Sequence, residues 1–437
     1  MRVLAVFIAA VILWVSEATP LVVTGIGVFV ALVLCGGIDR PDPTLTPGVP
    51  DFSPQMVSNW FGDRVVFFLL GIFLVAGAIT CTHVVDHAAL RLLKIIGTSP
   101  RRLRQGVFWV TFLASWFMAE HAVTAMLFPV VARIRDALGK PRGSSTYIAG
   151  LFHALAWGAT IGGIVTYLGG ARIALAMGIA QKQGLATPSF LELMGYSLPI
   201  AIPFGIAAAI ILEFAFPVDI ATVAPAREAL EERRRELGRF GVRQQLVTLI
   251  LALTVAMWAW TGVRYLAPVA LGSAALLMGS GLVRWRDLQH HVPWDLLLME
   301  GGALALCAAL EATGAAKWGA HQAFGVLGHS PLVIITVVTL AAILLTEMFS
   351  NPAVVTLLVP LLIASAPALG FADDPLLLVM AVALPCGLSF MLPLGSPPLA
   401  IAFSSGEYKV AKVLAWGLLL DLLAVPIIVA AYWFFWR

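Results

Sequence analysis

The sequence predicts an all-α integral membrane protein made of two inverted five-span repeats, each with a re-entrant hairpin and a broken helix. Of its 437 residues, 60% are apolar and only 12% are charged, and the mean hydropathy is +0.95. A soluble domain has about 25% charged residues, so a soluble enzyme, a nucleic-acid-binding protein and a disordered protein are all disfavoured. Many apolar runs have the length of a membrane span, and their order is similar in the two halves of the chain.

Eight uninterrupted apolar runs approach the roughly 20 residues that a helix needs to cross a bilayer. Two further runs, 148–180 and 376–405, are interrupted by clusters of glycine or proline and predict broken helices. The eight uninterrupted candidates are 2–19, 21–37, 65–83, 190–216, 245–262, 266–283, 294–312 and 410–434.

Two pairs of shorter runs predict re-entrant hairpins. Residues 107–118 and 122–132 are each too short to span, because a helix of about a dozen residues reaches only ~18 Å. A similar pair, 331–347 and 352–366, surrounds Ser350-Asn351-Pro352. Such backbone is tolerated at membrane depth only where it is buried in protein or lines a cavity.

The order of these elements divides the chain into a first repeat at 1–216, a linker helix at 217–244 and a second repeat at 245–437. Each repeat has three spans, a hairpin, a broken span and a final span. Five crossings are an odd number, so the second repeat is inverted relative to the first. Inverted repeats with discontinuous helices are typical of secondary transporters, whose sites lie near mid-membrane.

The distribution of basic residues predicts the orientation. Most of the 27 Lys and Arg residues fall on one face if the N-terminus is outside, and the positive-inside rule then puts both termini outside the cell (inner) membrane. The linker is rich in arginine, as a nucleic-acid-binding patch would be, but glutamates alternate with the arginines at helical spacing. We interpret it as a solvated, ion-paired helix, with no nucleic-acid partner.

Ionisable residues near the predicted first hairpin tip are the first candidates for function. Glu120 and His121 lie where a charge costs about 2.5–3.5 kcal/mol even on the gentler scales. Arg172, in the matching broken helix, is the cation that could pair with Glu120. A functional role and a purely structural pair both remain open. A zinc site formed with His153 lacks recognisable ligand spacing.

The second hairpin tip and the second helix break offer uncharged polar groups. Ser350, Asn351 and Ser396 supply hydroxyl and amide groups, and helix N-termini there favour an anion. Carbonyl oxygens at a broken end, as at Gly395, suit sodium. Simple capping by serine is the alternative interpretation, and Glu300 and Glu347 are interpreted as packing or capping partners rather than ligands.

Several segments resemble the divalent anion:sodium symporter family, within the superfamily that includes arsenite and sodium/proton antiporters. LWVSEATPLVVTG, IIGTSPRRL and PWDLLLMEGGALALCAALEATGAAKW resemble its conserved segments, in the same order. LTEMFSNPAVVTLLVP resembles its second "TE-x-x-SNTA" hairpin, and LSFMLPLGSPPLAIAFSSGEYK resembles the broken helix that follows. The resemblance covers essentially the whole chain.

The resemblance implies a homodimer in which the hairpin tips and broken helices bind one anion and sodium ions, and move as an elevator against a dimerising scaffold. This chain departs from the family where Ala119-Glu120-His121 replaces the first Ser-Asn-Thr, where Ala171-Arg172-Ile173 replaces Pro-Pro-Asn, and where Pro352 replaces threonine. A proton therefore becomes an alternative coupling ion in the first half. The predicted substrate-binding residues are Ser350, Asn351, Pro352, Ser396, Pro397, Arg172, His121 and Thr124. The predicted coupling-ion residues are Glu120, Gly169, Gly170, Ser350, Asn351 and Gly395, with sodium near the last three of them.

These features predict a secondary transporter of a small anion, either a di- or tricarboxylate or an oxyanion such as sulfate, by symport or exchange. A cation/proton antiporter that uses Glu120 is the alternative within transport, although Arg172 would disfavour a cation site unless it is paired. An intramembrane enzyme requires a nucleophile and base or a metal, and the sequence contains neither a GxSxG nor an HExxH motif.

Overall fold

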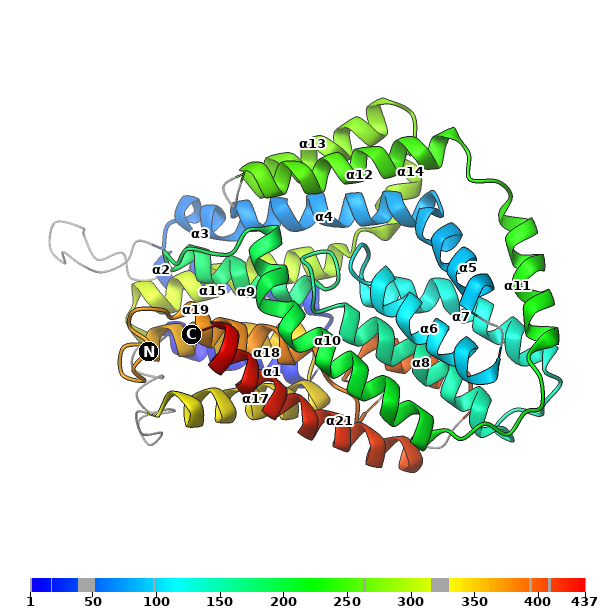
Figure 1. The fold of residues 1–437 in the computed structure, drawn as a ribbon. Helices are drawn as coiled ribbons and strands as arrows, with labels where there is room; N and C mark the ends of the chain where they lie inside the picture. The colour runs from blue at the N-terminus through cyan, green and yellow to red at the C-terminus, as the bar shows by residue number, and fades with distance from the viewer. Residues whose placement is uncertain are drawn as a thin grey trace, which may run out of the picture.

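The structure is a computed structural model that describes residues 2–16, 18–37, 52–96, 99–261, 265–315, 330–392, 395–407 and 410–436. Every regular element in these ranges is a helix, so the predicted all-α class is confirmed (Figure 1). The first half contains α1 Arg2–Ser16, α2 Leu21–Gly37, α3 Pro54–Phe61, α4 Arg64–Cys81, α5 Val84–Ile96, α6 Pro100–Ala114, α7 Glu120–Ala137, α8 Thr146–Gly162, α9 Ala171–Lys182 and α10 Phe190–Ala215. After α11 Ala224–Leu237, the second half contains α12 Val242–Thr261, α13 Leu266–Gly279, α14 Trp285–Leu288, η2 Gln289–His291, α15 Trp294–Ala312, α17 Pro331–Met348, α18 Asn351–Ser365, α19 Leu376–Ala383, η3 Pro385–Gly387, α20 Pro397–Phe403, α21 Val410–Ala431 and η4 Tyr432–Trp436.

Five helical stretches in the described part of the chain are long and apolar enough to cross a membrane, and one of them, Pro54–Cys81, consists of α3 and α4 together. A sixth is formed if Trp285–His291 and Trp294–Leu310, which meet at 58°, make one bent span. The five are Pro54–Cys81, Phe190–Ala215, Val242–Thr261, Pro331–Met348 and Val413–Trp436. The span predicted at 266–283 is shorter than expected, because α13 has 14 residues and ends before Gly281, whose φ is +72°.

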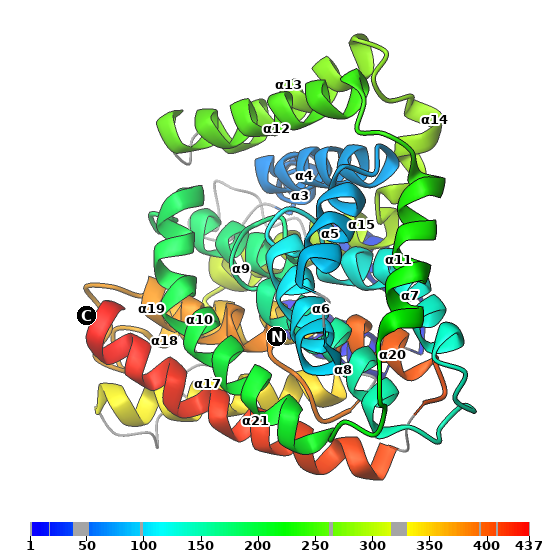
Figure 2. The same cartoon turned by 45° about the vertical axis from the view of Figure 1, so that its right-hand side comes forward.

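Helices from the two halves alternate in the packing. α2 packs against α15, and α4 packs against α13, so each half lends a helix to the other. Glycines permit the close approach: a Cβ on Gly25 of α2 would lie 2.7 Å from the Leu298 carbonyl oxygen. The views in Figures 1 and 2 agree that α12 and α13 lie along one side of the molecule, with α17 and α21 along the opposite side.

The predicted hairpins are pairs of helices joined by short turns. α6 and α7 meet through residues 115–119, and α17 and α18 meet through residues 349–350. The arms are 15 to 18 residues long. The arms of the second hairpin lie within a residue of the predicted 331–347 and 352–366, whereas the prediction of arms of about a dozen residues was wrong for the first hairpin. α6 and α7 extend into the basic segments that flank the apolar runs, and α17 is apolar enough over its full length to span.

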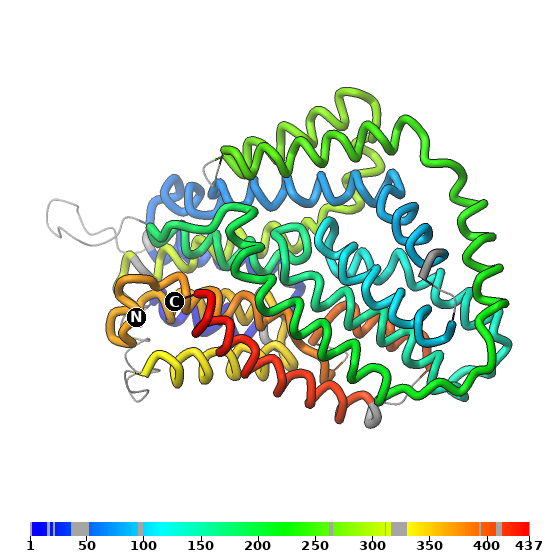
Figure 3. Tube along the Cα trace, in the orientation of Figure 1, coloured from blue at the N-terminus to red at the C-terminus, as the bar shows by residue number. Residues whose placement is uncertain are grey.

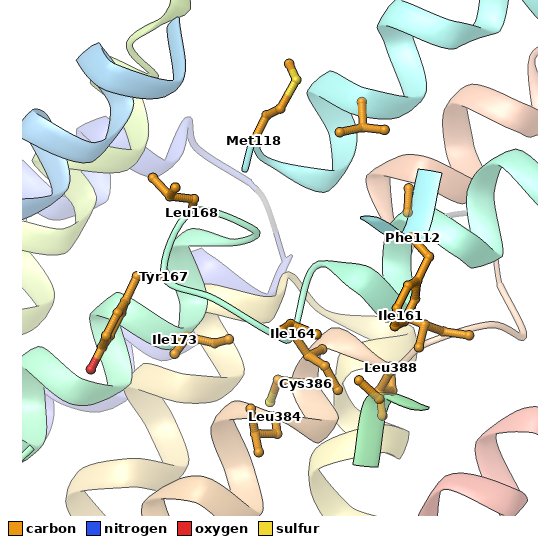
Figure 4. Close-up of a cluster of buried hydrophobic side chains, with 14 of the residues drawn as sticks. Phe112, Met118, Ile161, Ile164, Tyr167, Leu168, Ile173, Leu384, Cys386 and Leu388 are labelled. Atoms are coloured by element: carbon orange, nitrogen blue, oxygen red, sulfur yellow. The ribbon is translucent and has the colours of Figure 1, made fainter. Parts of the chain in front are cut away.

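Both predicted helix breaks are present. Residues 163–170 separate α8 from α9, and residues 388–396 separate η3 from α20. Hairpin arms pack across the halves, since α18 contacts α9 and α7 contacts α20. Buried side chains fill the space between the breaks, and Figure 4 shows Ile164 of the first break close to Cys386 and Leu388 at the second.

The predicted linker helix is α11, which packs against α5 and α7. The predicted ion pairing of this helix is confirmed, and it extends to the neighbouring helices. Glu236 accepts a hydrogen bond of 2.7 Å from Arg133, and Glu231 lies 3.1 Å from Lys94. In Figures 1 and 3, α11 forms one end of the molecule, and both termini lie at the other end.

Candidate functional site

A buried ion pair closes the tip of the first hairpin. Glu120 is the first residue of α7, and its backbone N–H donates to the Gly169 carbonyl at 3.0 Å. Both Glu120 carboxylate oxygens accept hydrogen bonds from Arg172, Oε1 from Nη1 at 2.7 Å and Oε2 from Nη2 at 3.0 Å. The two side chains are 5% and 3% exposed. Such a bidentate pair is geometrically specific, and its two charges neutralise each other.

Three glycines lie against this ion pair, where any larger residue would clash with it. A Cβ on Gly163 would lie 2.2 Å from Glu120 Oε2, and a Cβ on Gly387 would lie 2.0 Å from Arg172 Nη2. A Cβ on Gly170 would lie 2.6 Å from Nη1 of the same arginine. Since Gly387 belongs to the second half, Arg172 joins the first hairpin to the second broken helix.

Helix dipoles explain why the two charges need each other. Arg172 is the second residue of α9, where the positive end of the helix dipole disfavours a cation. The Glu120 carboxylate lies at the N-terminus of α7, where a negative charge is favoured. Thr124 is fully buried, and its hydroxyl donates to the Glu120 carbonyl at 2.9 Å, so it stabilises the tip rather than facing open space.

His121 lies beside the ion pair but faces a cavity of about 600 Å³. The cavity extends from Ala119 and His121 at the tip to α11, where Arg233 lines it. His83, Asp86, His290 and His291 also line the cavity, from α4–α5 and from η2. His83 Nδ1 lies 3.4 Å from an Asp86 carboxylate oxygen. Burial raises the pKa of Asp86, and the neighbouring His83 offsets part of that rise.

The second hairpin tip is held by uncharged groups. Thr346 donates its hydroxyl to Asn351 Oδ1 at 2.5 Å and to the Cys386 carbonyl at 3.2 Å. Gly395 is pressed against the same turn, because a Cβ there would lie 2.9 Å from the Thr346 carbonyl oxygen. The Ser350 and Ser389 hydroxyls are buried and have no hydrogen-bond partner among the described residues.

The remaining predicted residues lie on or near the second break. Ser396 is buried, and its hydroxyl shares a hydrogen bond of 3.2 Å with Thr160 of α8, which joins the two halves. Pro397 begins α20 and is exposed, while Pro352 in the first turn of α18 is half-buried. The structure thus joins each hairpin tip to the helix break of its own half, and joins the halves at Arg172 and Ser396.

Sequence reasoning overlooked several polar residues of this region. Thr346, Thr160 and Ser389 carry no charge and have no distinctive sequence pattern, so no signal in one sequence identifies them. Asp421 did give a signal, because an acid in the middle of an apolar span is costly. His83, His290 and His291, which lie at the ends of apolar runs or between them, gave no signal of this kind; they line the cavity and are exposed.

Comparisons with known proteins identify the family. A family model described as "Citrate transporter" matches residues 11–384. The chain belongs to this transporter family. The "Sodium-dependent dicarboxylate transporter SdcS" of Staphylococcus saprophyticus is 27% identical, and the match covers 98% of this chain and 86% of that protein. The protein of that name from Staphylococcus aureus strain USA300 is 26% identical over 96% of this chain and 83% of its own length. The resemblance to divalent anion:sodium symporters is therefore confirmed.

Solved structures show the same fold at low identity. The YdaH transporter of Alcanivorax borkumensis matches 95% of this chain and 98% of its own, with a TM-score of 0.60 and 15% identity. A second similar structure is MtrF of Neisseria gonorrhoeae, which its title relates to "a Class of Antimetabolite Efflux Pumps". The match covers 98% of this chain and 97% of MtrF, with a TM-score of 0.59 and 13% identity. These structures support the fold alone. The family match, together with the apolar helices, indicates a multi-pass membrane protein of the secondary anion-transporter type.

Proposed function

We propose that this transporter carries a small dianion of the dicarboxylate class, and that the anion reaches the hairpin tips through the 600 Å³ cavity. The observation that carries the proposal is the chemistry of that cavity. It ends at the first hairpin tip, and four histidines, Arg233 and the Asp86 carboxyl group line it. Arg233 is hydrogen-bonded to Glu236 and His83 lies 3.4 Å from Asp86, so the groups that the lining offers an anion are hydrogen-bond donors rather than free charges. The relatives are named as dicarboxylate transporters.

Coupling differs between the two halves in this proposal. The Ser350 and Ser389 hydroxyls, buried without a partner among the described residues, together with the tightly packed turn at Gly395, support a sodium site in the second half. Hard cations prefer such oxygen ligands. In the first half the Arg172 guanidinium fills the space between the tip and the break, so it supplies a permanent positive charge. We therefore expect fewer coupled sodium ions than two equivalent sites would give.

The arrangement does not favour the cation/proton antiporter. Both oxygens of Glu120 accept hydrogen bonds from Arg172, and the pair is walled by glycines. A carboxylate that exchanges cations must release its partner in every cycle, at the cost of leaving a buried charge unpaired.

The same proposal includes the domains, orientation and motion. The first repeat at 1–216 and the second at 245–437 are inverted relative to each other within one chain. Two copies of the chain form a homodimer that works as an elevator, with both termini outside. The position of both termini opposite the basic helix α11 supports this orientation (Figure 1). The exposed apolar face of α12, where Trp260 is 87% exposed, supports contact with lipid or with a second copy.

The decisive experiment is uptake of a four-carbon dicarboxylate into proteoliposomes, with and without an inward sodium gradient. Wild type should accumulate the dianion when sodium is present. Asn351→Ala should lose uptake and keep its expression and oligomeric state, because it removes the amide at the second tip. Asn59→Ala, at an exposed position of α3, is the matched control and should transport normally. Normal uptake by Asn351→Ala would refute the site, and a wild type without dicarboxylate uptake would refute the substrate class.

The number of coupled sodium ions tests the role of the buried pair. Uptake should rise with sodium concentration less steeply than two sites require, and Glu120→Gln and Arg172→Ala should change the sodium or pH dependence. A steep multi-sodium dependence that both variants leave unchanged would show that the pair is only structural. The measurement is initial uptake rate against sodium concentration at several pH values.

A further inference from the structure

A smaller cavity, of about 170 Å³, lies where α4, α13 and α9 meet, and we call it the α9 cavity. It shares no lining residue with the 600 Å³ cavity, and none of the residues predicted to bind substrate or a coupling ion lines it. In both views of the fold α4 lies between α13 and α9 (Figures 1 and 2). The α9 cavity is therefore distinct from the site at the hairpin tips.

The inner walls of the α9 cavity are apolar and aromatic. The rings of Phe68 on α4 and Tyr167 in the first helix break lie edge to face, with their centroids 5.6 Å apart. Both residues line the cavity with Met177 of α9, and all three are buried. The Tyr167 hydroxyl donates to the Pro188 carbonyl at 2.7 Å, which holds the ring in place. An apolar cavity of about 150 Å³ binds benzene, so the α9 cavity has the volume for one aromatic ring.

The polar groups of the lining mark the open end of the α9 cavity. Arg64 is exposed, and Gln181 and Thr187 are half-buried, in contrast to the buried walls. Arg64 is the one charged residue among the described residues of the lining, and it makes no ion pair with any described acid. The neighbouring Asp63 carboxylate instead accepts a hydrogen bond of 3.1 Å from the Val65 N–H. A guanidinium at the mouth of an apolar space suits a ligand with one carboxylate.

The α9 cavity lies between helices that belong to different packing units. α4 packs closely against α13, whereas α9 follows the first helix break and carries Arg172 of the buried ion pair. The contact between α4 and α9 is tight beside the cavity, because a Cβ on Gly178 would lie 2.3 Å from Val65 Cγ1. A molecule that fills the cavity contacts α9 on one side and α4 and α13 on the other, so it opposes any sliding of α9 along α4.

We propose that the α9 cavity is an inhibitory binding site for a small aromatic carboxylate. The ring lies among Phe68, Tyr167 and Met177, and the carboxylate accepts hydrogen bonds from Arg64 at the mouth. A dicarboxylate fits less well, because its second carboxylate would face apolar walls without a partner. The binding follows from the cavity itself, whereas the inhibition rests on the proposed transport function and on the motion of α9 within it.

Equilibrium dialysis of radiolabelled benzoate against the purified full-length protein tests the site without requiring transport. Wild type should bind benzoate saturably, and acetate, which has the carboxylate without the ring, should bind about tenfold more weakly or worse, because no ring is buried. An acetate affinity equal to that of benzoate would overturn the proposal. An excess of a four-carbon dicarboxylate should leave benzoate bound. Competitive displacement would place benzoate in the transport site and would also overturn the proposal.

Two substitutions at opposite ends of the α9 cavity test its location. Arg64→Gln removes the cation and should weaken benzoate binding about tenfold or more, whereas Arg286→Gln, at an exposed position of α14, should bind as wild type does. Ala267→Leu, on the α13 side of the lining, narrows the cavity and should also weaken binding. Its control is Ala275→Leu, at an exposed position of the same helix. Wild-type affinity in both Arg64→Gln and Ala267→Leu would overturn the assignment.

Uptake into proteoliposomes tests the inhibition. Benzoate should lower the maximal rate of dicarboxylate uptake by wild type and leave the dicarboxylate concentration at half-maximal rate unchanged. Arg64→Gln, compared with its own uptake in the absence of benzoate, should resist. This comparison also controls for benzoate that crosses the bilayer as the neutral acid, which affects both proteins alike. Equal inhibition of both proteins would overturn the inhibitory role. If wild type binds benzoate but takes up no dicarboxylate, the proposed function fails and the binding site stands.

Discussion

At the scale of single residues, the bidentate pair between Glu120 and Arg172 is the interaction whose disruption we expect to cost the most stability. Both groups are buried, so removal of one partner leaves an uncompensated charge that typically costs 3–5 kcal/mol. Arg172→Met should therefore lower the free energy of unfolding by about that amount. The double variant Glu120→Gln/Arg172→Met should recover most of the loss, because neither charge remains. Thermal unfolding in detergent measures both.

An exposed ion pair provides the control for this prediction. Lys94 and Glu231 lie 3.1 Å apart, and their side chains are 43% and 41% exposed. Exposed pairs contribute about 0–1 kcal/mol, so Lys94→Met should change the melting temperature little. If Arg172→Met had an equally small effect, Glu120 would have to be neutral in the fold.

The ionisable residues of the site could be predicted, and their contacts could not. Glu120 and Arg172 stand out as charges in apolar segments, and their pairing was one of two predicted outcomes. The cost of burying charge explains why one sequence is informative there. Neutral groups such as Thr346 and Ser389 produce no such signal, since hydroxyls occur in many spans. Their positions depend on how the second hairpin packs, which only the structure reveals.

At the scale of helices, the close packing of α2 against α15 depends on Gly25. Gly25 faces the α15 backbone, where a Cβ would lie 2.7 Å from both the Leu298 oxygen and Met299 Cα, whereas a Cβ on Gly27 would meet nothing within 4 Å. Gly25→Ala should destabilise the protein by about 1–3 kcal/mol through overpacking. Gly27→Ala, two residues away on the same helix, should not. The yield of monodisperse protein and its melting temperature compare the two.

Helix lengths show where sequence patterns stop being informative. The spans and breaks follow from hydropathy and from glycine and proline clusters, and α4, α8 and α10 lie where they are expected. The arms of the first hairpin are longer than predicted because α6 and α7 continue into basic segments. Backbone bonds can extend a helix beyond the apolar run that reveals it, so hydropathy fixes the centre of a helix better than its ends.

At the scale of the whole molecule, helices of the two halves pack together, and this packing determines which groups of helices can move as units. α2 packs with α15 and α4 packs with α13, so these four helices form one unit that contains parts of both halves. The hairpins and broken helices form a second set, joined across the halves through Arg172 and Ser396. Sequence order alone suggested two consecutive repeats, and it could not show that the packing divides the chain differently.

The cavity between these two sets should close or relocate during transport if the hairpins move against the scaffold. Ala76 of α4 and Ala122 of α7 line it from the two sides. We expect Ala76→Cys/Ala122→Cys, in a background without the four native cysteines, to lose dicarboxylate uptake when a cleavable bifunctional thiol reagent joins the two sites. Cleavage of the reagent should restore uptake, and each single-cysteine protein should remain active after treatment. Undiminished uptake by fully crosslinked protein would mean that α4 and α7 keep a fixed relation throughout the cycle, which an elevator does not allow.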